Sequence, residues 1–215
     1  MRRFLRGAGW SLIGLGCFVL FFLLYQLVGT NATADNQQNS LRRELEQSWS
    51  AQAGIPATRR PSGTGKAIPV GKGIALIQIP KIKVEKVVVQ GVGRDDLKKG
   101  PGHVPSSVMP GQPGTFAVSG HRTTYGAPFF KLNELVKGDI ITVISRTSIY
   151  TYSVTATKIV RPTDTSVLDN ARGRDGRLRP TIVLTTCHPR FSARQRFIVF
   201  GDLVAQVPNN GTVAA

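Results

Sequence analysis

The residues best suited to covalent chemistry are one cysteine, three histidines and two closely spaced arginines. Cys187 ends the apolar run 180–187 (PTIVLTTC), whereas the other cysteine, Cys17, lies in an apolar N-terminal segment. A thiol with a histidine and a cation within reach is a candidate nucleophile. The competing interpretation is a buried cysteine that acts as a small apolar side chain. The choice therefore depends on whether a base and a cation can reach Cys187.

Among the histidines, His121 is the preferred partner of the thiol. It follows the apolar run 115–120, where Gly120 permits an abrupt strand exit that would present the imidazole at the end of the strand. His188 is adjacent to Cys187, and neighbours on an extended chain point to opposite faces, so it is poorly placed. His103, in the loop 100–105, is the second candidate; it lines the cleft or is simply exposed.

Attack on an amide carbonyl creates an oxyanion, which an arginine can stabilise because its guanidinium is always charged and offers several donors. Arg194 and Arg196 are two residues apart, so both can share the face of a strand that points towards the thiol. Arg196 opens the apolar run 196–200 and is the first choice, with Arg194 second. The alternative for either is a solvated basic residue at a strand edge.

The N-terminal segment predicts a membrane anchor. Residues 7–28 contain no charged side chain, and Arg2, Arg3 and Arg6 precede them. This length is enough to span a bilayer as a helix, and the arginines favour a cytoplasmic N-terminus over residues 1–6. A cleaved signal peptide is the competing interpretation, because Ala32-Thr-Ala34 has a small-x-small pattern. In either case the remainder is exported, and no disulfide can join Cys17 to Cys187.

Residues 29–73 are predicted to form an extracytoplasmic stalk, with a short polar helix over 36–50 and a flexible basic spacer over 51–73. The whole chain has 28 Lys and Arg against 12 Asp and Glu, a net charge of +16, which favours polyanionic neighbours. The sequence contains no helix-turn-helix, zinc-finger or aromatic-rich RNA-binding pattern, so nucleic acid is not an expected partner. Anionic lipid and acidic wall polymers qualify on charge alone, and a basic solvated surface near a membrane is the favoured interpretation.

Residues 74–205 are predicted to form the catalytic domain, and 206–215 a flexible tail. Short apolar or alternating runs between Gly and Pro predict a mostly β fold, a closed and mainly antiparallel barrel. Short helical turns are expected near 95–98, 128–132 and 166–168. The polar connection 162–180 is either a functional loop or a surface insertion. The seven predicted strands cover residues 74–79, 86–90, 114–119, 139–145, 149–160, 181–186 and 196–204.

Three motifs together resemble the sortases, the membrane-anchored cysteine transpeptidases of Gram-positive bacteria. They are Leu184-Thr-Thr-Cys187, Ser119-Gly-His121-Arg upstream, and an arginine nine positions after the cysteine. The longer run 119–130 (SGHRTTYGAPFF) is similar to class E sortases of high-GC actinobacteria. The resemblance covers residues 74–204 plus the anchor. It implies a sortase barrel of eight strands, one more than the pattern predicts.

The resemblance also implies a mechanism. Cys187 would attack the Thr-Gly bond of a C-terminal sorting signal on a secreted protein, and an amine of a peptidoglycan precursor would resolve the acyl-enzyme. By motif position His121 is the general acid or base, Arg196 positions the substrate and stabilises the oxyanion, and Thr186 lines the cleft. Class E similarity implies a preference for Leu-Ala-x-Thr-Gly over Leu-Pro-x-Thr-Gly signals, with Tyr125 as a candidate determinant.

No cofactor or metal is expected. The calcium dependence of some other sortases is not carried over, because no matching acidic ligands are identified, and Asp164 and Asp169 are better suited to capping or solvent roles. Two rival functions remain at this point. One is a wall-peptide hydrolase or L,D-transpeptidase, although the latter usually has a Ser-x-Gly-Cys motif. The other is a non-enzymatic barrel that binds wall polymers through its charge.

Overall fold

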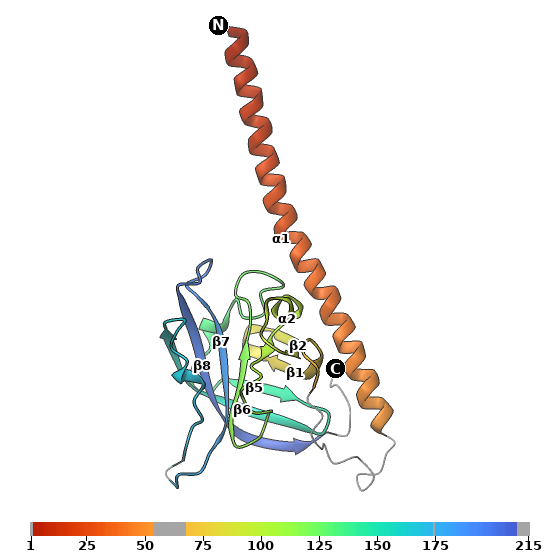
Figure 1. Ribbon diagram of the computed structural model, residues 1–215, viewed down its shortest axis with the longest axis vertical. Coiled ribbons are helices and arrows are strands. Elements are labelled where there is room, and N and C mark those ends of the chain that lie inside the picture. Colours follow the sequence, from red (N-terminus) through yellow and green to blue (C-terminus); the bar gives the residue numbers. More distant parts are fainter. Residues whose placement is uncertain (1, 54–67, 174, 210–215) are drawn as a thin grey trace.

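The computed structural model describes residues 2–53, 68–173 and 175–209. One long helix, α1 (Arg2–Ala53), leads into a closed barrel with the strand order β1-β2-β3-β4-β7-β8-β6-β5 (Figure 1). The short helices are η2 (Pro80–Ile82), α2 (Arg94–Lys99), η3 (Leu132–Glu134) and η4 (Ser166–Leu168). The strands are β1 (Gly73–Ile79), β2 (Val84–Gln90), β3 (Gly102–His103), β4 (Gly114–Ser119), β5 (Ile140–Ile144), β6 (Ser148–Val160), β7 (Pro180–His188) and β8 (Gln195–Pro208).

The predicted fold class, a mostly β closed barrel of eight strands, is confirmed. The strand absent from the seven-strand pattern is β3, which consists of two residues and pairs with β2 in parallel and with β4 in antiparallel. Two residues are too few to show an alternation of apolar and polar side chains, so no sequence pattern marks this strand. It nevertheless closes the sheet between β2 and β4.

The barrel interior is filled by large apolar side chains from strands on both sides. Phe116, Tyr152, Ile182 and Leu184 are fully buried there. The phenol of Tyr152 accepts a hydrogen bond from the backbone N–H of Gly111 at 2.9 Å, which satisfies its buried oxygen. This core makes the β4, β7 and β8 wall a rigid support for side chains at its end.

The strand β7 lies between β4, with which it is parallel, and β8, with which it is antiparallel. The parallel pair runs in register from Gly114 and Pro180 to Ser119 and Thr185. Because β4 and β7 run the same way, both end at the same rim of the barrel, where β8 begins. The segment 120–179 between them forms η3, β5, β6 and η4 on the way back. The topology therefore gathers the ends of three strands at one rim.

The C-terminal half of α1 packs on the outside of the barrel. A stripe of side chains from this half is buried against β1, β2 and β5. The predicted short helix over 36–50 is therefore the docked part of a longer helix, and the boundary predicted at residue 28 falls inside that helix. The buried apolar stripe comprises Leu41, Leu45 and Trp49 of α1, with Leu76, Val87, Val89 and Ile144 of the barrel.

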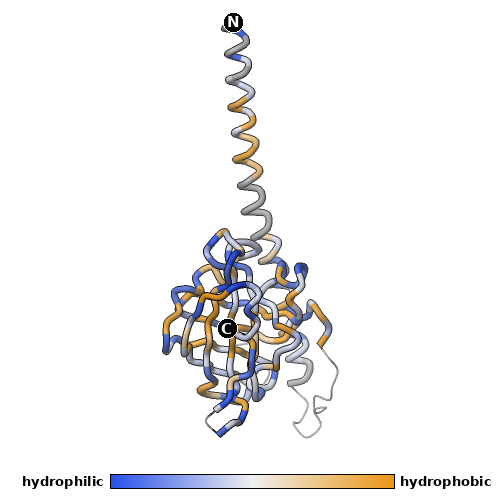
Figure 2. The backbone as a smooth tube through the Cα atoms, turned by 60° about the vertical axis from the view of Figure 1, so that its left-hand side comes forward, coloured by the Kyte–Doolittle hydropathy of each residue, from blue (hydrophilic) through white to orange (hydrophobic). Residues whose placement is uncertain are grey.

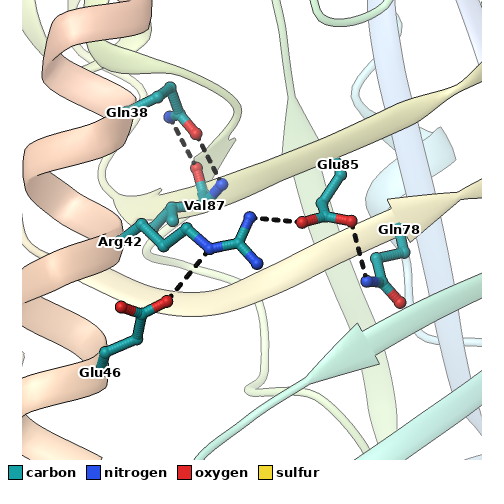
Figure 3. A network of polar contacts seen from close by, with 6 residues as sticks. All are labelled: Gln38, Arg42, Glu46, Gln78, Glu85 and Val87. Carbon is teal, nitrogen blue, oxygen red and sulfur yellow. Dashed lines mark hydrogen bonds and ion pairs between the residues drawn. The ribbon is translucent and has the colours of Figure 1, made fainter. Parts of the chain in front are cut away.

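Gln38 joins α1 to the backbone of β2 (Figure 3). Its Nε2 donates to the carbonyl of Val87 at 3.1 Å, and the N–H of Val87 donates to its Oε1 at 2.7 Å. A side-chain amide thus takes the place of a neighbouring strand along the part of β2 that β3 is too short to cover. Beside it, Arg42 forms ion pairs with Glu46 and with Glu85 of β2.

The N-terminal half of α1 projects beyond the barrel and carries exposed large apolar side chains between Trp10 and Phe22 (Figure 2). Among the residues that the structure describes, no helical stretch is both long and apolar enough to cross a bilayer. Most of the predicted spacer 51–73 lies outside the described residues, as does the end of the predicted tail, 210–215. The division of the chain into anchor, stalk and tail stays a prediction.

Candidate active site

Cys187 lies near the end of β7 and directly opposite Arg196 of β8 in the antiparallel register. Side chains of residues that face each other across two strands lie on the same side of the sheet, with Cβ atoms about 4.5–5.5 Å apart. The thiol is half-buried. The predicted nucleophile and the first-choice arginine are therefore neighbours, on the same face of adjacent strands.

His121 follows β4, which lies on the other side of β7 from β8. The parallel register pairs Ser119 with Thr185, and continued by two residues it places His121 level with Cys187. Two hydrogen bonds extend this pairing past the end of β4, because Gly120 N–H donates to the carbonyl of Thr185 at 3.0 Å and Thr186 Oγ1 donates to the carbonyl of Gly120 at 2.8 Å. Base, thiol and cation thus lie on three consecutive strand ends.

Gly120 is required for this strand exit. A Cβ atom at this position would lie 2.5 Å from the ring of Phe129, a fully buried core residue. Thr186 is 2 % exposed, and its hydroxyl is already engaged with the carbonyl of Gly120. This hydrogen bond ties the end of β7 to the residue after β4, and the predicted cleft role of Thr186 stays a prediction.

The imidazole of His121 is poised as a neutral base. Its Nε2 is buried and has no hydrogen-bond partner among the described residues. Burial lowers the pKa of His121 below the ordinary histidine value, because the charged form is desolvated. The ring lies against Tyr125, with centroids 5.1 Å apart at 40°. An unpaired neutral nitrogen beside a thiol is able to accept its proton.

Tyr125 begins a tight turn in the loop after β4. Tyr125, Gly126 and Ala127 all have positive φ angles, of 52°, 73° and 41°. Two non-glycine residues in this region within one turn are uncommon and mark a backbone held by its surroundings. The turn places the Tyr125 ring on His121, so this predicted substrate residue does lie next to the predicted base.

The guanidinium of Arg196 is held against its own strand. Its Nη1 donates to the carbonyls of Ala193 and Gln195, both at 3.0 Å. Among the described residues Nε and Nη2 have no partner, so donors remain for a developing oxyanion. Arg194 is exposed in the turn before β8, and its backbone N–H donates to Ser192 Oγ at 3.3 Å. The order of preference between the two arginines stays a prediction.

A further arginine, Arg122, was given no role by the sequence patterns. It is 4 % exposed, and its Nη1 donates to the carbonyl of Cys187 and to Nδ1 of His188, each at 3.2 Å. Its Nη2 donates to Asn133 Oδ1 at 2.6 Å, and its guanidinium lies over the ring of Phe197. Burial and the positive charge of Arg122 lower the pKa of His188. Arg122 thus holds the peptide unit that carries the thiol.

His103 belongs to the scaffold. It lies on β3, which is separated from β7 by β4, and it is 2 % exposed. Its Nδ1 contacts Gln90 Oε1 at 2.7 Å, its Nε2 contacts Ser107 Oγ at 3.0 Å, and the ring stacks on Phe116. The structure does not bring this residue to Cys187, and both of its nitrogens already have partners.

The burial of His103 predicts a pH dependence of stability. Burial lowers the pKa of His103 in the folded protein, so the unfolded chain binds more protons as the pH falls below the ordinary histidine value. The free energy of unfolding therefore decreases from pH 7 to pH 5, by at most about 1.4 kcal/mol per pH unit for this group. Urea unfolding of His103→Gln at both pH values should show a smaller decrease than the wild type; an equal decrease would assign the effect to other groups.

The long connection 162–180 starts beside Arg196, because Val160 at the end of β6 pairs with that residue. Asp164 accepts a hydrogen bond from Ser166, and the carbonyl of Asp169 accepts one from Thr115, at the start of β4 and the end of the barrel opposite Cys187. The capping or solvent roles expected of these two aspartates stay a prediction. Within the described residues, no group of three His, Cys, Asp or Glu side chains is arranged to hold a metal ion.

The geometry supports acyl transfer. A half-buried thiol lies opposite an arginine with free donors and, by extension of the register, level with a desolvated imidazole. These are the three kinds of group needed for attack on a carbonyl, proton transfer and stabilisation of an oxyanion. The peptide that carries the thiol is clamped by a buried arginine. The arrangement is built on strand ends of a rigid barrel rather than on a mobile segment.

Comparison with known proteins agrees with this chemistry. A family model described as the sortase domain matches residues 77–204. The chain is 32 % identical over 215 residues to sortase SrtE1 of Streptomyces coelicolor, covering 95 % of this chain and 58 % of that relative. It is 30 % identical over 206 residues to sortase D of Bacillus subtilis, covering 94 % and 96 %. The chain thus spans less than two thirds of the length of SrtE1.

Solved structures show the same fold. A sortase D5 transpeptidase of Clostridium perfringens superimposes with a TM-score of 0.64 at 29 % identity, over 77 % of this chain and 99 % of that one. Sortase E1 of Streptomyces coelicolor, solved with a tripeptide in its active site, superimposes with a TM-score of 0.60 at 32 % identity, over 64 % and 91 %.

Proposed function

This chain belongs to the sortase family of cysteine transpeptidases and is most similar to class E members, and we propose that it joins secreted proteins to the cell wall. In this proposal it cleaves a C-terminal sorting signal between Thr and Gly and transfers the protein to an amine of a peptidoglycan precursor. The observation that carries the proposal is the register, which puts Cys187 opposite Arg196 and, by extension, level with His121.

The proposed reaction has two steps. In the first, His121 takes the thiol proton, Cys187 Sγ bonds to the threonine carbonyl carbon, and Arg196 stabilises the oxyanion. The C–N bond then breaks, and His121 returns the proton to the leaving glycine amine. In the second step an amine attacks the thioester, gives its proton to His121 and forms a new amide, and the thiolate is released and reprotonated.

We assign signal preference to the turn that carries Tyr125. Its ring lies on His121, so it borders the position where the residues before the scissile bond must bind. A fixed aromatic wall at this place suits the smaller alanine of Leu-Ala-x-Thr-Gly better than the ring of proline. We propose that Leu-Ala-x-Thr-Gly is the preferred signal. Equal turnover of the two peptides would remove this assignment.

We also propose that residues 7–28 anchor the protein in the membrane, with residues 1–6 in the cytoplasm and the catalytic domain outside. The support is the uncharged apolar segment behind three arginines and the exposure of its large apolar side chains between Trp10 and Phe22. They lie on a helix that projects from the barrel (Figure 2). In this arrangement the acceptor amine belongs to a wall precursor held near the same membrane.

Mass spectrometry tests the function directly. The full chain in detergent is incubated with Leu-Ala-x-Thr-Gly or Leu-Pro-x-Thr-Gly peptides and an amine acceptor, beside Cys187→Ala. The expected result is a product joined at threonine, with an acyl-enzyme of matching mass, and neither species with Cys187→Ala. An absence of both species from the wild type with either peptide would contradict the proposal.

A further inference from the structure

The barrel rim that carries Cys187 also presents an exposed phenylalanine among arginines. Phe191 is 83 % exposed and has a φ angle of 63°, so the backbone turns sharply and directs an apolar ring to the outside. It lies in the loop between β7 and β8, with exposed Arg190 before it and exposed Arg194 after it. Arg190 lies over the ring of Phe130, 4.2 Å from its centroid, which ties this loop to the one after His121.

The end of β6 extends the same surface. Val160, its last residue, is paired with Arg196, so Ile159 and Arg161 lie at the rim beside the start of β8. Both side chains are exposed. Residues 158–164 and 188–196 together carry five Lys or Arg side chains and one acidic residue, Asp164. We call five exposed residues of this surface the basic rim: Ile159, Arg161, Arg190, Phe191 and Arg194.

The N-terminal part of α1 projects past the same end of the barrel that carries the basic rim. A Cβ atom on Gly126, in the loop after His121, would lie 3.6 Å from Ala34 Cβ of α1, so the helix passes the rim at residue 34. The residues before it project beyond that rim, whereas Leu41 to Trp49 pack along the barrel wall (Figure 1). From residue 34 back to residue 28, where the apolar segment ends, the helix rises by only about 9 Å.

We propose that the basic rim contacts an anionic lipid surface, with the arginines at the phosphates and Phe191 in the interfacial layer. The inference rests on the membrane anchor of the proposed function. An anchor continuous with the docked helix holds the rim within about one helix diameter of the bilayer surface. The active site then faces the membrane, where sorting signals and lipid-linked acceptors are located.

Charge and apolarity together identify the partner. The five Lys and Arg side chains of residues 158–164 and 188–196, against one acidic residue, attract a polyanion. The exposed aromatic ring of Phe191 adds affinity for the boundary between lipid headgroups and acyl chains. A soluble polyanion would use the charges alone and leave Phe191 in water. A bilayer containing anionic lipid uses both features, and α1 places one next to this rim.

The test uses the full chain, with Phe191→Trp as a reporter, in vesicles of phosphatidylcholine with or without phosphatidylglycerol, each with brominated acyl chains that quench tryptophan. Trp10 lies in the proposed anchor and Trp49 is buried against the barrel, and the wild-type signal from these two is subtracted. We expect the added tryptophan to be quenched in the anionic vesicles. Replacing Arg190 and Arg194 by Gln should lower the ratio of docked to undocked rim about fivefold for each arginine.

A matched control is Val207→Trp, because Val207 is also exposed but pairs with Ile149 at the opposite end of the barrel. It should stay unquenched. If Trp10 is quenched but the tryptophan of Phe191→Trp is not, the proposed membrane anchor is supported and the proposed contact of the basic rim with lipid is wrong. If Trp10 is also unquenched, the anchor itself is wrong. If a sorting-signal peptide, and not lipid, changes the emission of that reporter, the loop contacts peptide and the lipid assignment fails.

Discussion

A fragment that begins at Ala51 is expected to aggregate, whereas one that begins at Ala32 is expected to remain monomeric and to unfold cooperatively. The fragment that begins at Ala51 lacks Leu41, Leu45 and Trp49, which are buried against the barrel. It also removes Gln38, whose amide pairs with the N–H and carbonyl of Val87 (Figure 3). Deletion therefore exposes an apolar patch beside an uncovered strand edge, a combination that promotes association between copies.

The energetic effect is large relative to the stability of a domain. Burial of a large apolar side chain contributes about 1.5–3 kcal/mol, so the three side chains together contribute roughly 5–9 kcal/mol. A domain of this size has a total stability of about 5–15 kcal/mol. The fragment from Ala51 therefore loses most of its margin, and its barrel becomes unfolded or aggregated at moderate temperature.

Size-exclusion chromatography and thermal unfolding of the two fragments measure this effect. Within the longer fragment, Leu45→Ala should lower the free energy of unfolding by about 2–5 kcal/mol. Gln47→Ala, which alters an exposed residue of the same helix, should change it by less than about 0.5 kcal/mol. If the fragment from Ala51 is monomeric and unfolds at the same temperature as the longer fragment, α1 is not part of the folded unit.

Replacement of Arg122 is expected to reduce kcat about a hundredfold, although Cys187 and His121 are left unchanged. Arg122 donates to the carbonyl of Cys187 and is itself fixed by Asn133. Without it, the end of β7 loses the group that orients the peptide carrying the thiol, and a displacement of about 1 Å at a reacting atom costs about 10²-fold in rate. The effect falls on kcat rather than on KM, since Arg122 is buried and acts through the backbone of Cys187.

Steady-state kinetics of Arg122→Gln, with thermal unfolding measured alongside, separate positioning from a loss of folding. Asn133→Ala should move kcat in the same direction by less, because it frees the guanidinium without removing it. Arg122→Lys should restore part of the rate, since an ammonium can reach one acceptor but lacks the planar fork that spans several. A folded Arg122→Gln enzyme with wild-type kcat and a raised KM would instead place Arg122 in substrate binding.

The fold could be predicted from sequence wherever a strand was long enough to show its pattern. The strand β6 (Ser148–Val160) was predicted almost whole, whereas β3, with two residues, was missed. The helix α1 was divided at residue 28 because the uncharged run rich in Leu, Phe, Val and Ile ends there. The spacing of Leu41, Leu45 and Trp49 was the available signal that one face of this helix is buried.

The active site could be predicted as far as its motifs reach. The proposed roles of Cys187, His121 and Arg196 follow from residue type, spacing and family resemblance. The register sets Cys187 opposite Arg196, and its extension beyond β4 sets His121 level with Cys187. Arg122 is part of the same motif, but nothing local distinguishes a buried arginine from a solvated one, since its burial depends on Asn133 and Phe197 from other parts of the chain. His103 shows the converse case, a histidine whose type suggests chemistry and whose neighbours give it a structural role.

The parallel pairing of β4 with β7 has a consequence for the timing of activity. The two strands are joined by residues 120–179, so their pairing has a high contact order, a feature of slowly folding proteins. Arg196 lies opposite Cys187 only when β8 has added to the other edge of β7. The proposed nucleophile therefore has its proposed base and cation beside it only when β4, β7 and β8 have all paired.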